Sequence, residues 1–317
     1  MSEFYSKQHF LSIKVFDMSM NRRTFAATSF SLAAVAVTQS FMTHSAKSIE
    51  PIGRNGQSKF KFSLAAYSYR ELFKSKELTL SDFIADCASF GLEGTELTSY
   101  YFPNPAPPEY LRKLKHESFL AGLDVSGTAV GNDFCLPPGE ARDRQIAMVK
   151  TWIDNAEILG APVIRIFSGN AKSGSSVDEA HRLAVEGIEE CCQYAGEHGV
   201  HLALENHGGL TATANGMLKI VRDVKSPWFG VNVDTGNFHT EDVYGDLAKI
   251  APFALNVQVK VVIRGADGKT QPTDYNRLAK IMRDANYRGY IVLEYEEKGN
   301  PREECPKYLD ELREAFA

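Results

Sequence analysis

Acidic side chains follow three short apolar runs in the C-terminal half of the chain, where buried strands are expected to end. Glu205 ends the run His-Leu-Ala-Leu and is followed by Asn-His-Gly-Gly, and Asp234 is followed by Thr-Gly-Asn. Glu294 and Glu296 end the third run, and the alternation of side chains along a strand places both on one face. Carboxylates gathered in this way can bind a divalent cation or transfer protons.

Each of these residues also has a purely structural interpretation. Glu205 could be a solvated residue at a strand boundary, and Asp234 could close its strand with an Asx turn. Gln258 and Lys260 lie in a fourth run, where alternation directs both side chains inward, and Lys260 could form an interior ion pair with a neighbouring carboxylate. Because four consecutive runs end with polar side chains, the combination favours one common site.

The segments that would position these residues alternate between short runs rich in Val, Ile and Phe and longer amphipathic stretches, which is typical of βα units around parallel strands. The expected strands are 62–67, 94–98, 124–129, 162–168, 200–206, 229–234, 254–261 and 290–296. The expected helices are 79–90, 107–121, 139–159, 176–198, 212–224, 241–250, 272–286 and 304–315. A doubly wound sheet usually needs fewer strands and a Gly-rich first turn. We therefore predict an α/β fold, a single-domain (β/α)8 TIM barrel over 49–317.

Residues 1–48 are expected to be a targeting segment outside the barrel. Asn-Arg-Arg-Thr-Phe at 21–25 precedes a mildly apolar run and then small polar residues, the order of a twin-arginine signal peptide. The alternative is a disordered basic tail; the apolar run is short for a membrane span. Cleavage after Ser45 or Ser48 would each satisfy the small-residue rule, and Met20 is an alternative start. We expect an exported, periplasmic protein with no stable membrane insertion once the signal is removed.

Charge and cysteine content exclude other classes of protein. The formal net charge is −5, and residues 1–48 carry +3, so the predicted barrel carries −8. Such a balance repels a phosphate backbone, so no nucleic-acid partner is expected. The five cysteines are an odd number without a Cys-x-x-Cys pair, and we expect mostly buried thiols instead of a disulfide framework.

The polar motifs also carry a resemblance to a known family. They read Glu205-Asn-His-Gly-Gly, Asp234-Thr-Gly-Asn, Gln258-Val-Lys and Glu294-Tyr-Glu. In this order the chain resembles the sugar phosphate isomerase/epimerase family, xylose-isomerase-like barrels that include D-tagatose 3-epimerase, hydroxypyruvate isomerase and inosose dehydratase. The resemblance covers the whole barrel and identifies the superfamily better than the reaction.

The resemblance implies a metal centre with a catalytic pair. In the epimerases, the matching strand-five and strand-eight glutamates bind the metal and exchange substrate protons, which makes Glu205 and Glu294 the expected catalytic residues. The implied metal ligands are Glu205, Asp234, Gln258 and Glu294. The family usually has His where Gln258 stands, so the site would be all-oxygen; this favours Mn2+ or Mg2+ and leaves Co2+ or Zn2+ open. Alternatively, His207 supplies a nitrogen ligand.

Further residues are expected to contact a small carbohydrate substrate. Arg264 stands six residues beyond Gln258, as an arginine does in the epimerases, and Asn237 stands where they have a histidine. Tyr67 follows the first expected strand. The expected substrate-binding set is His207, Asn237, Lys260, Arg264 and Tyr67. Related barrels often form dimers or tetramers, so the resemblance also leaves a homo-oligomer open.

The implied activity is that of a metal-dependent isomerase or epimerase acting on a ketose or keto-sugar through an enediolate. One glutamate would remove a proton, and the other would return one to the opposite face or to the neighbouring carbon. Three alternatives stay open. Expulsion of a β-oxygen would make the chain a lyase or dehydratase on a keto-sugar or inosose, and the departure at Gln258 could mark a non-catalytic exported sugar-binding barrel. An apurinic endonuclease would need many histidines, and only His207 and His239 lie near strand ends.

Overall fold

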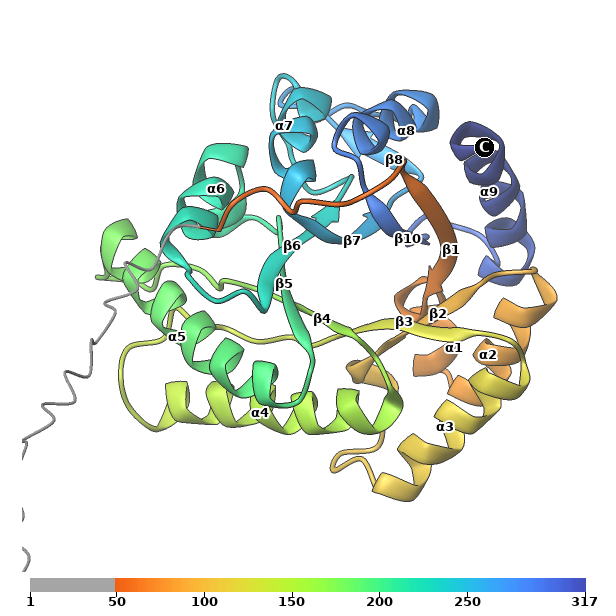
Figure 1. The fold of residues 1–317 in the computed structure, drawn as a ribbon, viewed down its shortest axis with the longest axis horizontal. Coiled ribbons are helices and arrows are strands. Elements are labelled where there is room, and N and C mark those ends of the chain that lie inside the picture. Colours follow the sequence, from red (N-terminus) through yellow and green to blue (C-terminus); the bar gives the residue numbers. More distant parts are fainter. Residues whose placement is uncertain (1–48) are drawn as a thin grey trace, which may run out of the picture. The chain divides into compact units, whose positions relative to one another are not determined.

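The computed structural model describes residues 49–317, so the predicted signal peptide lies outside the described residues. Eight parallel strands close into a barrel in the order β1-β10-β7-β6-β5-β4-β3-β2 (Figure 1). The barrel strands are β1 (Lys59–Ala65), β2 (Gly94–Thr98), β3 (Asp124–Ala129), β4 (Val163–Ile166), β5 (His201–Glu205), β6 (Phe229–Asp234), β7 (Ala254–Val259) and β10 (Arg288–Leu293). The predicted (β/α)8 fold and its eight strands are confirmed.

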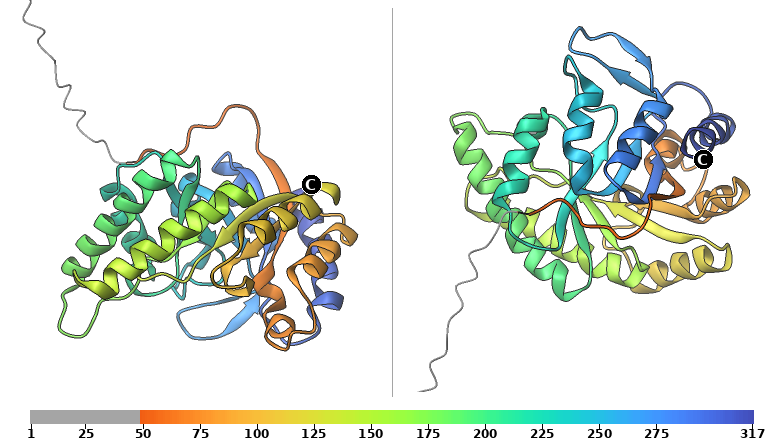
Figure 2. Two further views of the ribbon diagram at one scale, coloured as in Figure 1. Left: turned by 90° about the horizontal axis from the view of Figure 1, so that it is seen from below. Right: turned by 45° about the horizontal axis from the view of Figure 1, so that its top comes forward.

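Helices lie outside the strands around the barrel (Figures 1 and 2). They are α1 (Arg70–Lys74), α2 (Leu80–Ser89), α3 (Pro108–Leu120), α4 (Glu140–Leu159), α5 (Val177–Glu197), α6 (Ala214–Asp223), α7 (Val243–Ile250), α8 (Tyr275–Asp284) and α9 (Pro301–Phe316). Short 3-10 helices follow three of the strands: η1 (Ala66–Tyr69), η2 (Ser99–Tyr101) and η3 (Gly209–Thr211). A fourth, η4 (Ala251–Phe253), connects α7 to β7. The eight predicted helices correspond to α2 through α9.

Two elements were not predicted. Helix α1 is a single short turn without a hydrophobic period of its own. The antiparallel hairpin of β8 (Val262–Arg264) and β9 (Thr270–Pro272) follows β7 directly and projects from the barrel in Figure 2. Its two strands have three residues each, and β9 is exposed throughout, so neither carries a recognisable pattern. As a result, the helix expected from residue 272 begins at Tyr275.

Helix boundaries follow the local sequence. A capping box starts α2, in which the Thr79 hydroxyl accepts from the Asp82 N–H and the Asp82 carboxylate accepts from the Thr79 N–H. Gly160 ends α4 in the left-handed conformation, with φ of 78°, which a residue with a Cβ adopts at a cost. The next strand begins three residues later, so the glycine fixes where the chain returns to the barrel.

Strand register brings the predicted site residues to one end of the barrel. Glu205 pairs with Asn232 between β5 and β6, and Asp234 pairs with Gln258 between β6 and β7. Strand β10 lies on the other side of β7, and Glu294 directly follows it. All these positions are at the carboxyl ends of parallel strands, the end at which (β/α)8 barrels carry their functional groups.

The core forms between the strands and the surrounding helices. All five cysteines are free and buried, which confirms the expectation of buried thiols.

In the described part of the chain, no helix has the length and apolar character that crossing a membrane requires.

Candidate active site

A small polar cavity opens among the strand ends that carry the predicted residues. Its volume is about 250 Å3. It is lined by Tyr67, Tyr100, Arg165, Phe167, Glu205, His207, Asn237, Lys260, Glu294 and Glu296. Drug-sized ligands occupy pockets of roughly 300–1,000 Å3, so this cavity suits a smaller molecule. Charged side chains and aromatic rings share the lining, a combination that suits a hydroxylated ring.

Lys260 lies where three carboxylates meet. Its Nζ is 2.5 Å from Glu294 Oε2, 3.2 Å from Asp234 Oδ2 and 3.2 Å from Glu296 Oε1. Burial alone would lower the pKa of Lys260, but attraction by Asp234 and Glu294 outweighs burial and raises it well above the usual value. The ammonium therefore stays charged, and the interior ion pair considered for this residue is present.

The backbone around Lys260 is fixed on both sides. Its N–H donates to Thr235 Oγ1 at 2.9 Å, and its carbonyl accepts from Thr273 Oγ1 at 2.6 Å. The aliphatic stem passes over Gly236, where an added Cβ would lie 2.6 Å from Lys260 Cδ. The glycine of the Asp-Thr-Gly motif is thus required by the close approach of the lysine stem.

Glu205 is held by different partners. Arg165 Nε in β4 lies 2.8 Å from Glu205 Oε2, and both side chains are buried. Asn237 Nδ2 donates to Glu205 Oε1 at 2.8 Å, and Asn237 also lines the cavity, so its predicted contact with a substrate stays a prediction. Arg165 thus forms its buried ion pair with Glu205 on the neighbouring strand.

Gln258 points into a buried polar network. Its Nε2 donates to Glu96 Oε1 at 2.6 Å, and its Oε1 accepts from Asn232 Nδ2 at 2.6 Å. Asn256 closes the network by donating to Glu96 Oε2 and to Asn232 Oδ1. All four side chains are buried. A buried network whose members all have partners fixes the orientation of each side chain.

The two predicted catalytic glutamates have different acidities. Burial raises the pKa of Glu205 to about 7, against the attraction of Arg165. Burial also acts to raise the pKa of Glu294, but Lys260 outweighs it and the pKa lies below its ordinary value. Carboxyl groups whose environments separate their pKa values are typical of an acid and base pair.

The predicted metal ligands do not fit a divalent ion as they are arranged. Such an ion needs several oxygen atoms directed at one point. Among residues 49–317, no three His, Cys, Asp or Glu side chains are placed so that they could share an ion. The amide of Gln258 is bonded within its network, and Lys260 lies among the carboxylates. The divalent metal therefore stays a prediction, which an ion-binding experiment must test.

The other predicted residues are divided between the cavity and the surface. Tyr67 and His207 line the cavity, and the His207 ring packs on Phe167 with centroids 4.4 Å apart. Arg264 is exposed on the β8–β9 hairpin and does not line the cavity. Tyr100 and Phe167, which lie just beyond β2 and β4, also line the cavity but were not predicted. Tyr100 stands at the same distance after β2 as Tyr67 does after β1, and this matching position could have indicated it.

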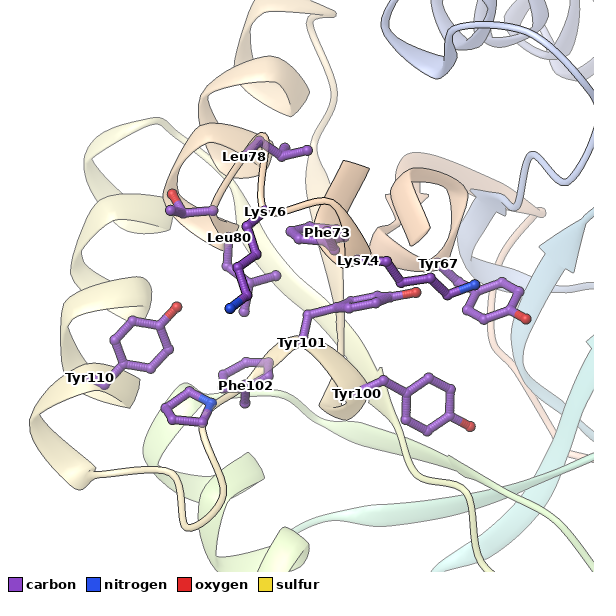
Figure 3. A pocket seen from close by; sticks show the side chains of 12 residues that line it. Tyr67, Phe73, Lys74, Lys76, Leu78, Leu80, Tyr100, Tyr101, Phe102 and Tyr110 are labelled. Carbon is purple, nitrogen blue, oxygen red and sulfur yellow. The ribbon is translucent and has the colours of Figure 1, made fainter. Parts of the chain in front are cut away.

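A larger aromatic cavity adjoins the first. Its volume is about 550 Å3, and Tyr67 and Tyr100 line both cavities. Figure 3 shows these two rings with Tyr101 at one end of the cavity and Tyr110 at the other. Tyr101 stacks on Phe73, with ring centroids 4.2 Å apart. The two cavities together offer a polar compartment beside an apolar one.

Comparison with known proteins agrees with this architecture. The family model described as a xylose isomerase-like TIM barrel matches residues 84–315. A D-psicose 3-epimerase structure with D-tagatose, from Clostridium cellulolyticum H10, is 16% identical with a TM-score of 0.68, covering 81% of this chain and 99% of that one. The structure of 3-keto-D-glucoside 4-epimerase from E. coli is 15% identical with a TM-score of 0.62, covering 81% of this chain and 100% of that one.

A further similar structure represents a different reaction. It is a probable 3-DHS dehydratase from Bacillus anthracis, 18% identical with a TM-score of 0.61, covering 80% of this chain and 98% of that one. No curated protein matches the sequence. At these identities the solved structures show the fold, while the family model matches well over half of the chain. The chain belongs to the family of xylose isomerase-like TIM barrels.

Proposed function

We propose that the chain is an isomerase of the epimerase type that moves a proton at the carbon next to the carbonyl of a keto-sugar. The observation that carries this proposal is the placement of Glu205 and Glu294 on one small cavity, each held by a different cation. Similar barrels include a D-psicose 3-epimerase and a 3-keto-D-glucoside 4-epimerase, which supports this class of reaction.

The two glutamates stand apart around the barrel. Strands β6 and β7 lie between β5, which carries Glu205, and β10, which precedes Glu294. A sugar ring between them would present one face to each carboxyl group. One glutamate would remove the proton from one face, and the other would return a proton to the opposite face, which inverts the carbon. Positioned acid and base groups of this kind contribute about 10² to 10⁴-fold to a rate.

The cations of the cavity suit the intermediate of such a reaction. Removal of a proton beside a carbonyl places negative charge on the carbonyl oxygen. Arg165 and Lys260 both line the cavity and carry N–H donors held in place before the substrate arrives. Donors that are fixed in advance stabilise developing charge without reorganisation, and this is commonly a large contribution to catalysis.

The adjoining aromatic cavity favours a keto-sugar that bears a substituent. A free monosaccharide would fill the polar cavity alone, whereas a glycoside could place its aglycone or second ring against Tyr67, Tyr100 and Tyr101. Rings offer both flat apolar surface and hydroxyl groups, which suits a second sugar or an aryl group. We therefore propose a keto-glycoside as the preferred substrate, met outside the cytoplasm if the predicted export signal operates.

Elimination is a second candidate, favoured by one observation. Glu296 follows Glu294 on the same face, lies 3.2 Å from Lys260 Nζ, and keeps 35% of its side chain exposed at the mouth of the cavity. A third carboxyl group there could protonate a departing β-oxygen, which would make the reaction that of a lyase or dehydratase. The similar dehydratase barrel is consistent with this outcome.

Proton exchange with solvent tests the proposal. The purified protein is incubated in D2O with free ketoses, keto-glycosides and inososes, and the products are followed by NMR. We expect deuterium at the carbon next to the carbonyl, with inversion for an epimerase and a new double bond for a lyase. If every substrate keeps all its protons while the protein is folded, the proposal is wrong and a sugar-binding role is favoured.

A further inference from the structure

We infer that the ammonium group of Lys260 takes the place in this site that a divalent cation was predicted to occupy. The inference concerns the charge arrangement of the cavity, and only its catalytic consequence rests on the proposed function. It makes the barrel a metal-independent one, in which N–H donors replace a Lewis acid at the substrate oxygen.

The position of Lys260 Nζ carries the inference. It contacts Asp234 from β6 together with Glu294 and Glu296 beyond β10, so carboxylates from two different strand ends converge on it. Two of these carboxylates belong to the predicted ligand set. An ion placed between Asp234 and Glu294 would need the oxygen atoms that Lys260 already contacts.

The lysine is also built into its position. Thr235 and Thr273 hold its backbone, and Gly236 leaves the space that its stem requires. A Cβ at position 236 would lie 2.6 Å from Lys260 Cδ, so the stem has this path only because the residue is glycine.

The charges agree with this assignment. Four acids line or adjoin the cavity, namely Glu205, Asp234, Glu294 and the partly exposed Glu296, and its two buried cations are Arg165 and Lys260. Together these cations supply the two positive charges that a divalent ion would bring. Adding such an ion beside both would place like charges within a few ångströms of each other, where repulsion is strong.

Gln258, the predicted ligand on β7, is hydrogen-bonded to residues other than the carboxylates around Lys260. Gln258 gives its amide N–H to Glu96 and its amide oxygen to Asn232, so neither end is directed to the carboxylates. Turning the oxygen toward an ion would leave buried donors of Asn232 and acceptors of Glu96 without partners, which is costly. The departure from the family's His-x-Lys pattern therefore lies at Gln258 alone, whose amide is bonded within the barrel network.

Manganese binding tests the inference without knowledge of the substrate. The full chain is treated with a chelator, freed of it, and titrated with Mn2+ while the free ion is followed by electron paramagnetic resonance. We expect wild type to leave the Mn2+ signal undiminished. Lys260→Ala and Lys260→Met should each bind Mn2+, because the carboxylates are then unpaired. Their affinity should exceed any residual affinity of wild type by about tenfold or more. Lys249→Ala, which removes an exposed lysine paired with Asp246, should behave as wild type.

The outcomes separate the alternatives. Stoichiometric Mn2+ binding by wild type that is lost in Glu294→Gln would overturn the inference and establish the predicted metal centre. Failure of Lys260→Ala and of Lys260→Ala with Gln258→His to bind Mn2+, although both unfold cooperatively on heating, would also overturn it. If the Lys260 variants bind Mn2+ and wild type does not, but no substrate exchanges deuterium, the inference stands and the proposed function fails.

Discussion

Lys260 stabilises an arrangement of carboxylates that would otherwise repel one another. Its Nζ is the cation nearest to Asp234 and Glu294, and both carboxyl groups are buried. Burying a charge without a partner is expensive, and removing one member of a buried pair typically costs about 3–5 kcal/mol. The residue therefore has a structural role in addition to any role in the reaction.

Replacing Lys260 by Met should lower the free energy of unfolding by about 3–5 kcal/mol at neutral pH, measured by urea denaturation. The loss should shrink at acidic pH. Without the ammonium, the buried carboxyl groups bind protons in the folded state that they release on unfolding, so stability falls as pH rises above about 4. Lys249→Met is the matched control. A loss that is the same at pH 4 and pH 8 would contradict the electrostatic origin.

Replacing Glu205 or Glu294 by Gln should each reduce proton exchange by about 10² to 10⁴-fold, because an amide cannot accept or return the proton. Glu314→Gln, an exposed change on α9, should leave the rate unchanged. Near-normal exchange in both cavity variants would show that the two glutamates are not the acid and base, even if the protein proves to be an isomerase.

At the scale of elements, the strand ends carry the polar cavity, and the connections after β1 and β2 line the aromatic cavity beside it. Helix η1 brings Tyr67 and helix η2 brings Tyr100 to the boundary between the two cavities. Tyr101 lies beside them and is supported by Phe73 from α1. These short helices follow β1 and β2, so variation there can change the aromatic cavity without disturbing the barrel.

Tyr101→Ala should therefore raise the KM for an aryl keto-glycoside roughly three- to tenfold, the loss expected for one aromatic contact, and leave a free ketose unaffected. Steady-state kinetics on the two substrates check this prediction. Phe119→Ala on α3 removes a ring that is 78% exposed and serves as a control. Equal effects on both substrates would mean that the aromatic cavity does not hold the substituent.

The alternation of apolar runs and amphipathic segments made the barrel predictable, because each strand and helix must bury one face in a regular period. The strand ends were predictable for the same reason, so Glu205, Asp234 and Glu294 could be assigned to one region. The β8–β9 hairpin was not, since strands of three residues are too short to show a period, and β9 has no buried face. Its conformation depends on pairing with itself after the barrel strand has ended.

Side-chain partners inside the barrel could not be predicted. Gln258 lies two residues from Lys260, yet one side chain joins Glu96 and the other joins Glu294. Both point inward, as alternation requires, but which partner each meets depends on strands that are far apart in the sequence. The same holds for Arg165, whose partner is Glu205 on the neighbouring strand.

At the scale of the whole molecule, the buried thiols report on the integrity of the barrel. Burial raises the pKa of Cys135 to about 11 and those of Cys191 and Cys305 to about 12. The thiolate is the reactive form, so the native protein at pH 8 should consume well under one equivalent of a thiol reagent such as DTNB, and the urea-unfolded protein should consume five. Rapid loss of one equivalent from folded protein would show a thiol that burial does not protect.

Solvent exchange in the presence of excess EDTA tests the central claim most directly. The protein is incubated in D2O with a keto-glycoside that it converts, and the deuterium content beside the carbonyl is measured by NMR in wild type and in Glu294→Gln. We expect wild type to exchange at the same rate with and without EDTA and the variant to lose exchange. Exchange by wild type that EDTA abolishes would contradict the metal-independent site. Exchange that persists in Glu294→Gln, or its absence in wild type with every keto-sugar, would contradict proton transfer by the glutamate pair.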